Sequence, residues 1–229
     1  MINVNAETMR SIDKYCIEVL GISGMILMEN AAIKIFTEVK NELVKNNGQY
    51  ISIFCGVGNN GGDGLAVARH LYLSGYTVNV FILGKLEKAS NDFKENFKII
   101  NNINKFDDMK INIEMVTEEN INFINEKIRN SHIILDGIFG TGLKRKVEGV
   151  YKEVILTINE SGKHIMSIDV PSGLDSDNGI ELGAAVRANK TITLQLKKNG
   201  FLNEQARKYC GKIKIVDIGI PDFVINKFL

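Results

Sequence analysis

Residues 51–68, ISIFCGVGNNGGDGLAVA, decide the fold, because they join a strand, a glycine-rich turn and a helix in direct succession. Residues 51–55 are a β-rich apolar run, residues 56–64 contain five glycines, and the apolar spacing over residues 65–73 predicts a helix. Glycines let a backbone approach a ligand closely and adopt positive φ. Free N–H groups at the start of a helix favour an anion. The stretch therefore predicts a turn that binds a phosphate-bearing ligand.

The letters Gly56-x-Gly58-x-x-Gly61 match the dinucleotide-binding fingerprint, but the rest of that motif is incomplete. A conventional dinucleotide fold places an acidic residue about 20 residues further on, at the end of the second strand, to hold a ribose hydroxyl. The expected second strand, residues 77–83, is followed by Gly84-Lys85, and the first acid after it is Glu87. A conventional NAD-dependent dehydrogenase is therefore disfavoured. The simplest structural alternative is a glycine-rich turn in which Asp63 is a plain helix N-cap.

Length, composition and charge favour one α/β domain over residues 1–229, in a cytoplasmic protein. The hydrophobic share of 45% and the charged share of 24% are ordinary for globular proteins. The net charge is +1 and no basic tract occurs, so neither nucleic acid nor an anionic membrane is an expected partner. No apolar run approaches about 18 residues, and the first residues lack a signal-peptide core. The three cysteines are far apart, which favours reduced thiols.

Apolar strand patterns alternate with helical patterns after two helices that are expected at residues 8–20 and 25–45. The expected strands are residues 51–55, 77–83, 110–116, 131–135, 164–168, 191–194 and 213–216. Helices are expected between them at residues 91–101, 118–128 and 150–159. This alternation predicts a mostly parallel sheet that is covered on both faces, with the two N-terminal helices as an addition.

Three acidic residues follow or end predicted strands, namely Asp63, Asp136 and Asp169. The carboxyl ends of parallel strands meet at one edge of a sheet, where ligands bind. Three acids at one edge require a cation, a proton or a ligand hydroxyl between them. The oxygen groups of Asn60, Asp136 and Ser172 suit a hard cation. A second glycine turn, residues 140–142, precedes three basic residues that either meet phosphates or form a solvated charge run.

Four motifs, in the order LMENAA, GVGNNGGDGLAVARHL, DGIFGTGL and SIDVPSGLDSDNG, resemble the NAD(P)H-hydrate epimerase family. This is the YjeF N-terminal domain, whose animal members are known as apolipoprotein A-I-binding proteins. The resemblance continues to residues 216–221 and covers nearly the whole chain. It implies a Rossmann-like three-layer αβα sandwich that binds K⁺ and is usually a homodimer. It also implies epimerisation at C6 of hydrated NADH or NADPH (NADHX or NADPHX), converting the R form to the S form, after which a separate ADP- or ATP-dependent dehydratase restores the cofactor.

The resemblance also assigns roles to particular residues. The residues implied to contact the substrate phosphates and ribose are Asn59, Asn60, Gly61, Gly62 and Asp63. Those implied to line the substrate are Gly140, Thr141, Gly142, Leu143, Lys144, Arg145, Lys146 and Asp169. The implied K⁺ ligands are Asn60, Asp136 and Ser172.

Asp169 is the expected acid/base group at the C6 hydroxyl or the ring nitrogen, because it follows a strand end and lies beside Ser172 in the sequence. Asp63 is the competing candidate.

A second function of a different class is a non-catalytic, dimeric interaction module. The same fold resembles the dimerising domain of an mRNA-decapping scaffold. The intact NNGGD sequence, together with Asp136 and Asp169, speaks against lost catalysis in this chain.

Overall fold

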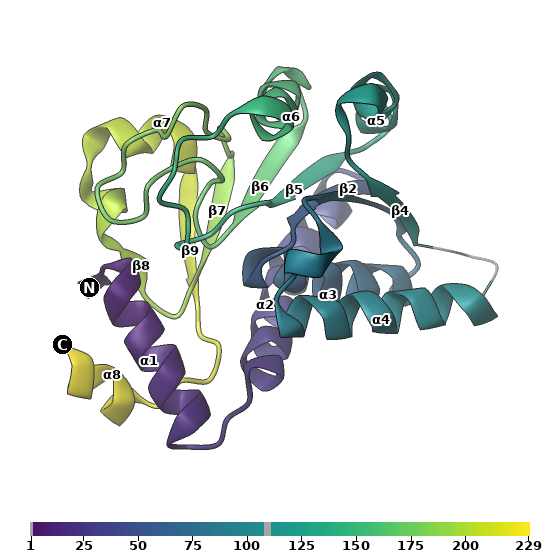
Figure 1. Ribbon diagram of the computed structural model, residues 1–229. Helices are drawn as coiled ribbons and strands as arrows, with labels where there is room; N and C mark the ends of the chain where they lie inside the picture. Colours follow the sequence, from purple (N-terminus) through teal and green to yellow (C-terminus); the bar gives the residue numbers. More distant parts are fainter. Residues whose placement is uncertain (1, 108–110) are drawn as a thin grey trace.

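A parallel β-sheet forms the centre of the computed structural model, which describes residues 2–107 and 111–229 (Figure 1). In spatial order its described strands are β4 (Asn112–Met115), β3 (Thr77–Leu83), β2 (Tyr50–Gly56), β5 (Ile133–Gly137), β6 (His164–Ile168), β7 (Lys190–Leu194) and β9 (Lys212–Val216). Each neighbouring pair is parallel. The chain builds β3 and β4 outward from one side of β2 and then starts the other half at β5, so the order reverses between β2 and β5. At such a reversal the carboxyl ends of the strands diverge and leave a crevice.

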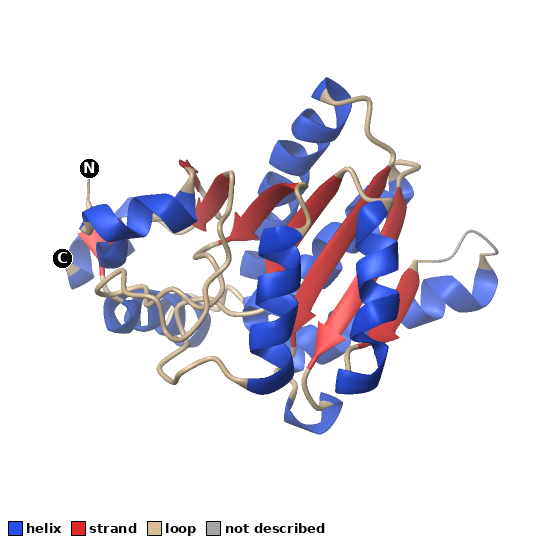
Figure 2. Cartoon of the chain, turned by 90° about the horizontal axis from the view of Figure 1, so that it is seen from above, coloured by secondary structure: helices blue, strands red, loops and turns tan. Residues whose placement is uncertain are grey.

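Helices cover both faces of this sheet (Figures 1 and 2). One face carries α2 (Gly24–Lys45), α3 (Asn59–Leu73) and α4 (Asn91–Phe106), and the other carries α5 (Ile121–Arg129) and α6 (Gly149–Glu160). In β2, Ile51, Ile53 and Cys55 pack toward the first face and Phe54 packs toward the second. A strand buried on both faces requires the near-continuous apolar run that the sequence shows. The predicted three-layer αβα sandwich is confirmed.

The N-terminal segment lies beside the far end of the chain. The short strand β1 (Asn3–Val4) pairs with β8 (Lys197–Lys198), and α1 (Ala6–Glu18) lies next to α8 (Asp222–Phe228) (Figure 1). A four-residue helix, α7 (Arg207–Cys210), precedes β9. The side chain of Asn5 accepts a hydrogen bond of 2.7 Å from the N–H of Thr8, which fixes the start of α1. The two helices expected ahead of the core are therefore present, and α1 follows a strand that the sequence did not predict.

The structure changes two expected elements. The helix expected at residues 118–128 is divided into a 3₁₀ turn, Glu118–Asn120, and α5. The side chain of Asn120 explains the break, because its Oδ1 accepts a hydrogen bond of 2.9 Å from the N–H of Thr117. The strand expected at residues 110–116 begins at Asn112, and residue 110 lies outside the described residues. Among the helices that the structure describes, none is long and apolar enough to cross a membrane.

Candidate functional site

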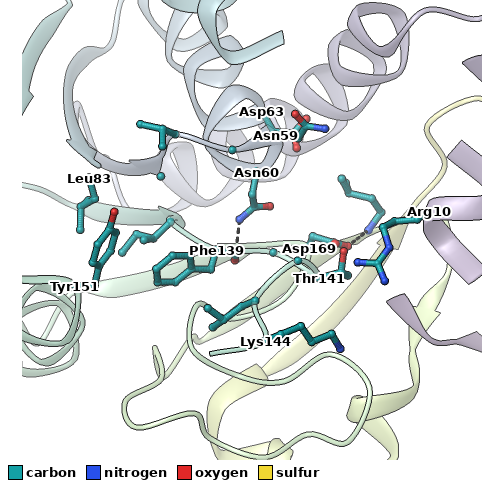
Figure 3. Close-up of a pocket in the computed structure, with 18 of the residues that line it drawn as sticks. Arg10, Asn59, Asn60, Asp63, Leu83, Phe139, Thr141, Lys144, Tyr151 and Asp169 are labelled. Carbon is teal, nitrogen blue, oxygen red and sulfur yellow. Dashed lines mark hydrogen bonds between the residues drawn. The ribbon is translucent and has the colours of Figure 1, made fainter. Parts of the chain in front are cut away.

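A pocket of about 780 Å³ opens where β2 and β5 end, at the reversal of strand order (Figure 3). This volume is typical of small-molecule and cofactor sites. The predicted substrate residues that line the pocket are Asn59, Asn60, Asp63, residues 140–145 and Asp169. The predicted residues that do not line it are Gly61, Gly62 and Lys146. Most of the predicted residues therefore line one cavity at the carboxyl edge of the sheet.

The glycines of the motif pack a helix against a strand. The sequence predicted a glycine-rich turn over residues 56–64 and a helix from residue 65, and this boundary is wrong, because α3 already begins at Asn59. None of these glycines has positive φ. A Cβ on Gly61 would overlap the carbonyl oxygen of Gly56, and a Cβ on Gly64 would lie 2.7 Å from Cys55 Sγ. Only glycine lets the first turns of α3 lie this close to β2. The motif therefore fixes the position of the helix start.

The start of α3 is open toward the pocket. Its N-cap is Gly58, which provides no side-chain hydrogen bond, whereas serine side chains cap α2 and α4. The simplest alternative, in which Asp63 is the N-cap, is therefore wrong, since Asp63 lies inside the helix. Asn59 and Asn60 occupy the first turn and line the pocket. Uncapped N–H groups at a helix start attract anions such as phosphates.

Asp63 is a buried carboxyl group without a partner. Its exposed fraction is 6%, and it makes no hydrogen bond or ion pair within residues 2–107 and 111–229. Burial, followed by the charges of Asp169, Asp13 and Asp92, raises the pKa of Asp63 well above its usual value. Because this pKa is higher in the folded than in the unfolded chain, ionising Asp63 as the pH rises lowers the free energy of unfolding. A group that destabilises the fold in this way is a candidate for a functional role.

Asp169 is held by a buried ion pair in a left-handed backbone conformation, with φ of 62°. Its Oδ1 accepts hydrogen bonds from Thr193 Oγ1 at 3.2 Å and from the N–H of Leu194 at 3.1 Å, and it pairs with Lys198 Nζ. Lys198 is 1% exposed and also donates to the carbonyls of Leu194 at 2.9 Å and Leu196 at 3.1 Å. These contacts fix the direction of the Asp169 side chain at the pocket wall. The sequence analysis missed Lys198, since nothing in Lys197-Lys198-Asn199 distinguishes it from a surface lysine.

Asn60, Asp136 and Ser172 converge on the backbone of Phe139. Asn60 Nδ2 donates to the carbonyl of Phe139 at 3.0 Å, and Ser172 Oγ accepts from its N–H at 2.8 Å. Ser172 Oγ donates to Asp136 Oδ1, and the N–H of Ser172 donates to Asp136 Oδ2 at 2.9 Å. Burial raises the pKa of Asp136, while the hydrogen bonds from Ser172 and Ser167 oppose this rise. The three predicted metal ligands are therefore neighbours in one cluster, in which Asp136 and Ser172 are buried and Asn60 is half-buried.

The basic residues after the second glycine turn differ in their surroundings. Lys144 lines the pocket and lies 2.7 Å from Asp177 Oδ2, and Arg145 also lines the pocket. The side chain of Lys146 is 71% exposed and lies 3.9 Å from Glu148. Lys144 and Arg145 therefore belong to the pocket wall, whereas Lys146 is part of the solvated surface.

Residues from α1 and α6 complete the two ends of the pocket. Arg10 and Asp13 of α1 line it near Asp169, and neither was predicted. Tyr151 and Leu83 lie at the opposite end from Arg10, where the rings of Tyr151 and Phe139 are 5.1 Å apart (Figure 3). The pocket is thus charged at one end and aromatic at the other. No local sequence signal marks these residues, because the fold brings them together from distant elements.

Comparison with known proteins identifies the family. Residues 24–200 match the family described as YjeF-related protein N-terminus. The NAD(P)H-hydrate epimerase of Anaerococcus prevotii is 37% identical over 229 residues, which cover 100% of both chains. The protein of the same name from Oenococcus oeni is 34% identical over 224 residues, covering 96% of this chain and 97% of its own.

Two further matches concern domain content and fold. The bifunctional NAD(P)H-hydrate repair enzyme Nnr of Thermofilum pendens is 37% identical over 212 residues, which are 92% of this chain and 38% of that protein. The crystal structure of yeast ynu0 has a TM-score of 0.81 at 24% identity and covers 100% of this chain and 93% of its own, so it shows the same fold. The resemblance drawn from the four motifs is confirmed, and this chain belongs to the family of YjeF-related protein N-termini.

Proposed function

We infer that this chain is an isomerase, an NAD(P)H-hydrate epimerase that interconverts the R and S epimers of NADHX and NADPHX at C6. Its relatives from A. prevotii and O. oeni carry that name and match it over nearly their full length. The observation that carries the inference is that one pocket combines the open start of α3 with the buried carboxyl groups of Asp63 and Asp169. A phosphate-bearing ligand whose reaction needs proton transfer fits this combination.

The charge distribution of the pocket suggests how the substrate lies in it. We place the pyrophosphate between the start of α3 and the basic residues Lys144 and Arg145, because both supply positive potential. The hydrated nicotinamide ring then lies at the charged end, beside Asp169 and Asp63. The adenine lies at the aromatic end, where Tyr151 offers a face for stacking.

Asp169 is the residue that we propose as the base for the C6 hydroxyl. A hydroxyl on a carbon bonded to nitrogen opens when a base takes the hydroxyl proton, the carbonyl forms and the bond between C6 and N1 breaks. Rotation about the bond between C5 and C6 turns the aldehyde, and N1 then adds to its other face and gives the opposite epimer. Asp169 is suited to this proton transfer because its side chain is fixed at the pocket wall by Thr193, Leu194 and Lys198.

A coupled assay tests the function. A purified dehydratase that accepts only the S form first consumes that form from a mixture of hydrated NADH epimers. Adding this protein in potassium buffer is expected to cause rapid consumption of the remaining R form, faster than the spontaneous rate. If the folded protein gives no acceleration, the result would favour the non-catalytic interaction module. Hydride transfer between NADH and small oxo-acids would instead revive the dehydrogenase.

We also propose that Asn60, Asp136 and Ser172 hold K⁺. The cluster supports this proposal because its side-chain oxygens and the carbonyl of Phe139 are all hard ligands, and because its single carboxylate balances one positive charge. When bound, the ion would stabilise the packing of the start of α3 against the segment after β5. The acid–base steps remain with the side chains that line the pocket.

K⁺ binding predicts a cation-specific rise in the melting temperature. At concentrations about 100-fold above Kd, a bound ion stabilises the folded chain by about 2.7 kcal/mol, which corresponds to about 5–11 °C for a protein of this size. We expect this rise in potassium chloride relative to choline chloride of equal ionic strength, with sodium chloride as a third arm. Asn60→Ala should abolish it, whereas Asn59→Ala should keep it, because Asn59 is exposed and it is Asn60 that is hydrogen-bonded to Phe139. Equal melting temperatures of the wild type in potassium and choline would contradict the site.

Three further properties complete the proposal. We propose a homodimer, supported by exposed apolar side chains on α1, α2 and α8, among them Ile17, Ile26 and Phe223. A mass in solution equal to one chain of 25.5 kDa would exclude it.

The functional partner that we propose is an ADP- or ATP-dependent dehydratase, since the bifunctional relatives are much longer than the region that matches. We propose the cytoplasm as the compartment because Cys16, Cys55 and Cys210 are free and buried.

A further inference from the structure

We propose that Asp13 of α1 is a second proton-transfer residue of the epimerisation, which delivers a proton to ring nitrogen N1 and takes it back on ring closure. This proposal rests on the epimerase function and extends it to a helix that precedes the sheet. Asp169 alone can serve the hydroxyl, but the nitrogen that leaves C6 also needs a proton. The structure offers a second carboxyl group at the same end of the pocket.

The geometry of α1 presents Asp13 to the substrate space. Met9, Ile12 and Cys16 pack into the core, which fixes the rotation of the helix. The N–H of Ala6 donates to Asp177 Oδ1 at 2.6 Å, which ties the start of α1 to the segment after β6. Asp13 lines the same pocket as Asp169 and Asp63. Its position is therefore set by the packing of Met9 and Cys16, which lie one helical turn away on the same side of α1, as an acid/base group requires.

Asp13 has no partner of its own. Throughout residues 2–107 and 111–229, its carboxyl group makes no hydrogen bond and no ion pair. The charged groups around it are Asp169 from the segment after β6, Asp63 from α3, Lys198 from β8 and Arg10 from its own helix. Lys198 is already committed to Asp169 and to two carbonyls. A partly buried, unpartnered carboxyl group that faces a ligand cavity serves no evident structural purpose.

The two aspartates differ in their surroundings, which suits them to different tasks. Asp169 is ion-paired, whereas burial and then the charge of Asp169 raise the pKa of Asp13 to about 6, with Lys198 opposing the rise. Asp13 therefore gains and loses a proton near neutral pH. Acid–base catalysis is most efficient when the pKa of the group lies near the working pH, and paired groups in unlike environments divide the roles of acid and base.

The step balances without an oxidant or a co-reactant. Asp169 accepts the proton of the C6 hydroxyl while the carbonyl forms and the electron pair of the bond between C6 and N1 passes to N1. Asp13 donates its proton to N1 and becomes a carboxylate. After rotation of the aldehyde, N1 attacks the other face of the carbonyl, Asp13 takes back the N1 proton, and Asp169 returns its proton to the oxygen.

The test compares Asp13→Asn with Glu18→Gln in the coupled assay, after subtraction of the spontaneous rate. Both changes remove one acidic group from α1, but the Glu18 side chain is 61% exposed and lies outside the pocket. Asp13→Asn should lower kcat by about 10²-fold with little change in KM, whereas Glu18→Gln should match the wild type. In the wild type, kcat/KM, which reports the pKa values of the free enzyme, should fall as the pH rises through about 6, and this descending limb should be absent in Asp13→Asn. Asp13→Glu should recover part of the rate and the limb.

The outcomes separate this proposal from the epimerase function. If the wild type shows no epimerase activity, the function itself is wrong. If the wild type is active and Asp13→Asn keeps its rate and its pH profile, Asp13 is not a proton-transfer residue, although the function stands. The melting temperature of Asp13→Asn should equal or exceed that of the wild type, because the change removes a carboxyl group whose ionisation costs stability. If Asp13→Asn does not fold, the wild type and Asp13→Glu still test the proposal. It is overturned if neither shows the fall in rate as the pH rises through about 6.

Discussion

Asp169→Asn is expected to lower kcat for C6 epimerisation by about 10²–10⁴-fold, the usual contribution of a positioned acid or base. Asparagine keeps the size of the side chain and tolerates the left-handed backbone at φ of 62°, where most other residues would be strained. It can still accept the hydrogen bonds from Thr193 and Leu194. The loss should therefore appear in kcat rather than in KM. A stopped-flow version of the coupled assay measures both.

Lys198 complicates this experiment and also supplies its control. Removing one partner of a buried ion pair leaves an uncompensated charge and destabilises proteins by about 3–5 kcal/mol. Asp169→Asn is therefore expected to melt below the wild type. Replacing both partners with neutral residues is often close to neutral in stability, so the double variant Asp169→Asn/Lys198→Met should regain much of the melting temperature.

The double variant separates chemistry from folding. If Asp169 is the base, activity stays low in the double variant although its stability returns. If Asp169 only neutralises Lys198 for structural reasons, activity returns together with stability. A single Asp169→Asn variant that is folded and nearly fully active would contradict the catalytic role outright and direct attention to Asp63, the other buried carboxyl group of the pocket.

The sheet and one wall of the pocket could be predicted from the sequence because their signals are local. Each strand is a short apolar run between polar residues, and the carboxyl ends of parallel strands meet at one edge. Asp136 and Asp169 come at the ends of such runs, so the sequence places them near Asn60 without any knowledge of the structure. The pocket lined by Asn60, Asp63 and Asp169 follows from these two rules.

The opposite wall could not be predicted because it depends on how distant elements pack. Asp13 lies on the side of α1 that also carries Met9 and Cys16, and the helical pattern does not show which distant elements meet that side. Lys198 becomes a buried partner of Asp169 only because the turn after β7 brings it beneath the pocket. The spacing of apolar residues predicts whether a segment is a helix or a strand. Which residues surround a polar side chain depends instead on how distant elements pack.

For the glycine motif, the sequence predicted the position in the sheet but not the backbone conformation, because part of the expected turn is helix. The sequence placed residues 56–64 at the carboxyl edge of the sheet, and residues 56–60 and Asp63 line the pocket there. The same letters suit a loop with positive φ and a helix pressed against a strand, because both need residues without a Cβ. The helix is observed, so the steric role of these glycines can be measured directly.

Gly61→Ala is therefore expected to destabilise the fold strongly, although alanine is the better helix former by about 1 kcal/mol. The added Cβ would overlap the carbonyl oxygen of Gly56, which is backbone of β2 and cannot rotate away. Overpacking typically costs about 1–3 kcal/mol, and the upper end is expected here because the backbone itself must move. After the gain of about 1 kcal/mol in helix propensity is subtracted, the melting temperature should fall by about 4–8 °C, as differential scanning calorimetry would record.

Gly58→Ala is the matched control within the same motif. A Cβ at Gly58 meets no atom within 4 Å, and its φ of −90° suits any residue. The remaining cost is the loss of a favourable N-cap, which is about 1 kcal/mol or less. If the glycines are required for the close approach of α3 to β2, Gly61→Ala must be far less stable than Gly58→Ala. Equal melting temperatures would mean that α3 can move outward at little cost, and the start of the helix would then be too loosely placed to hold a phosphate in one position.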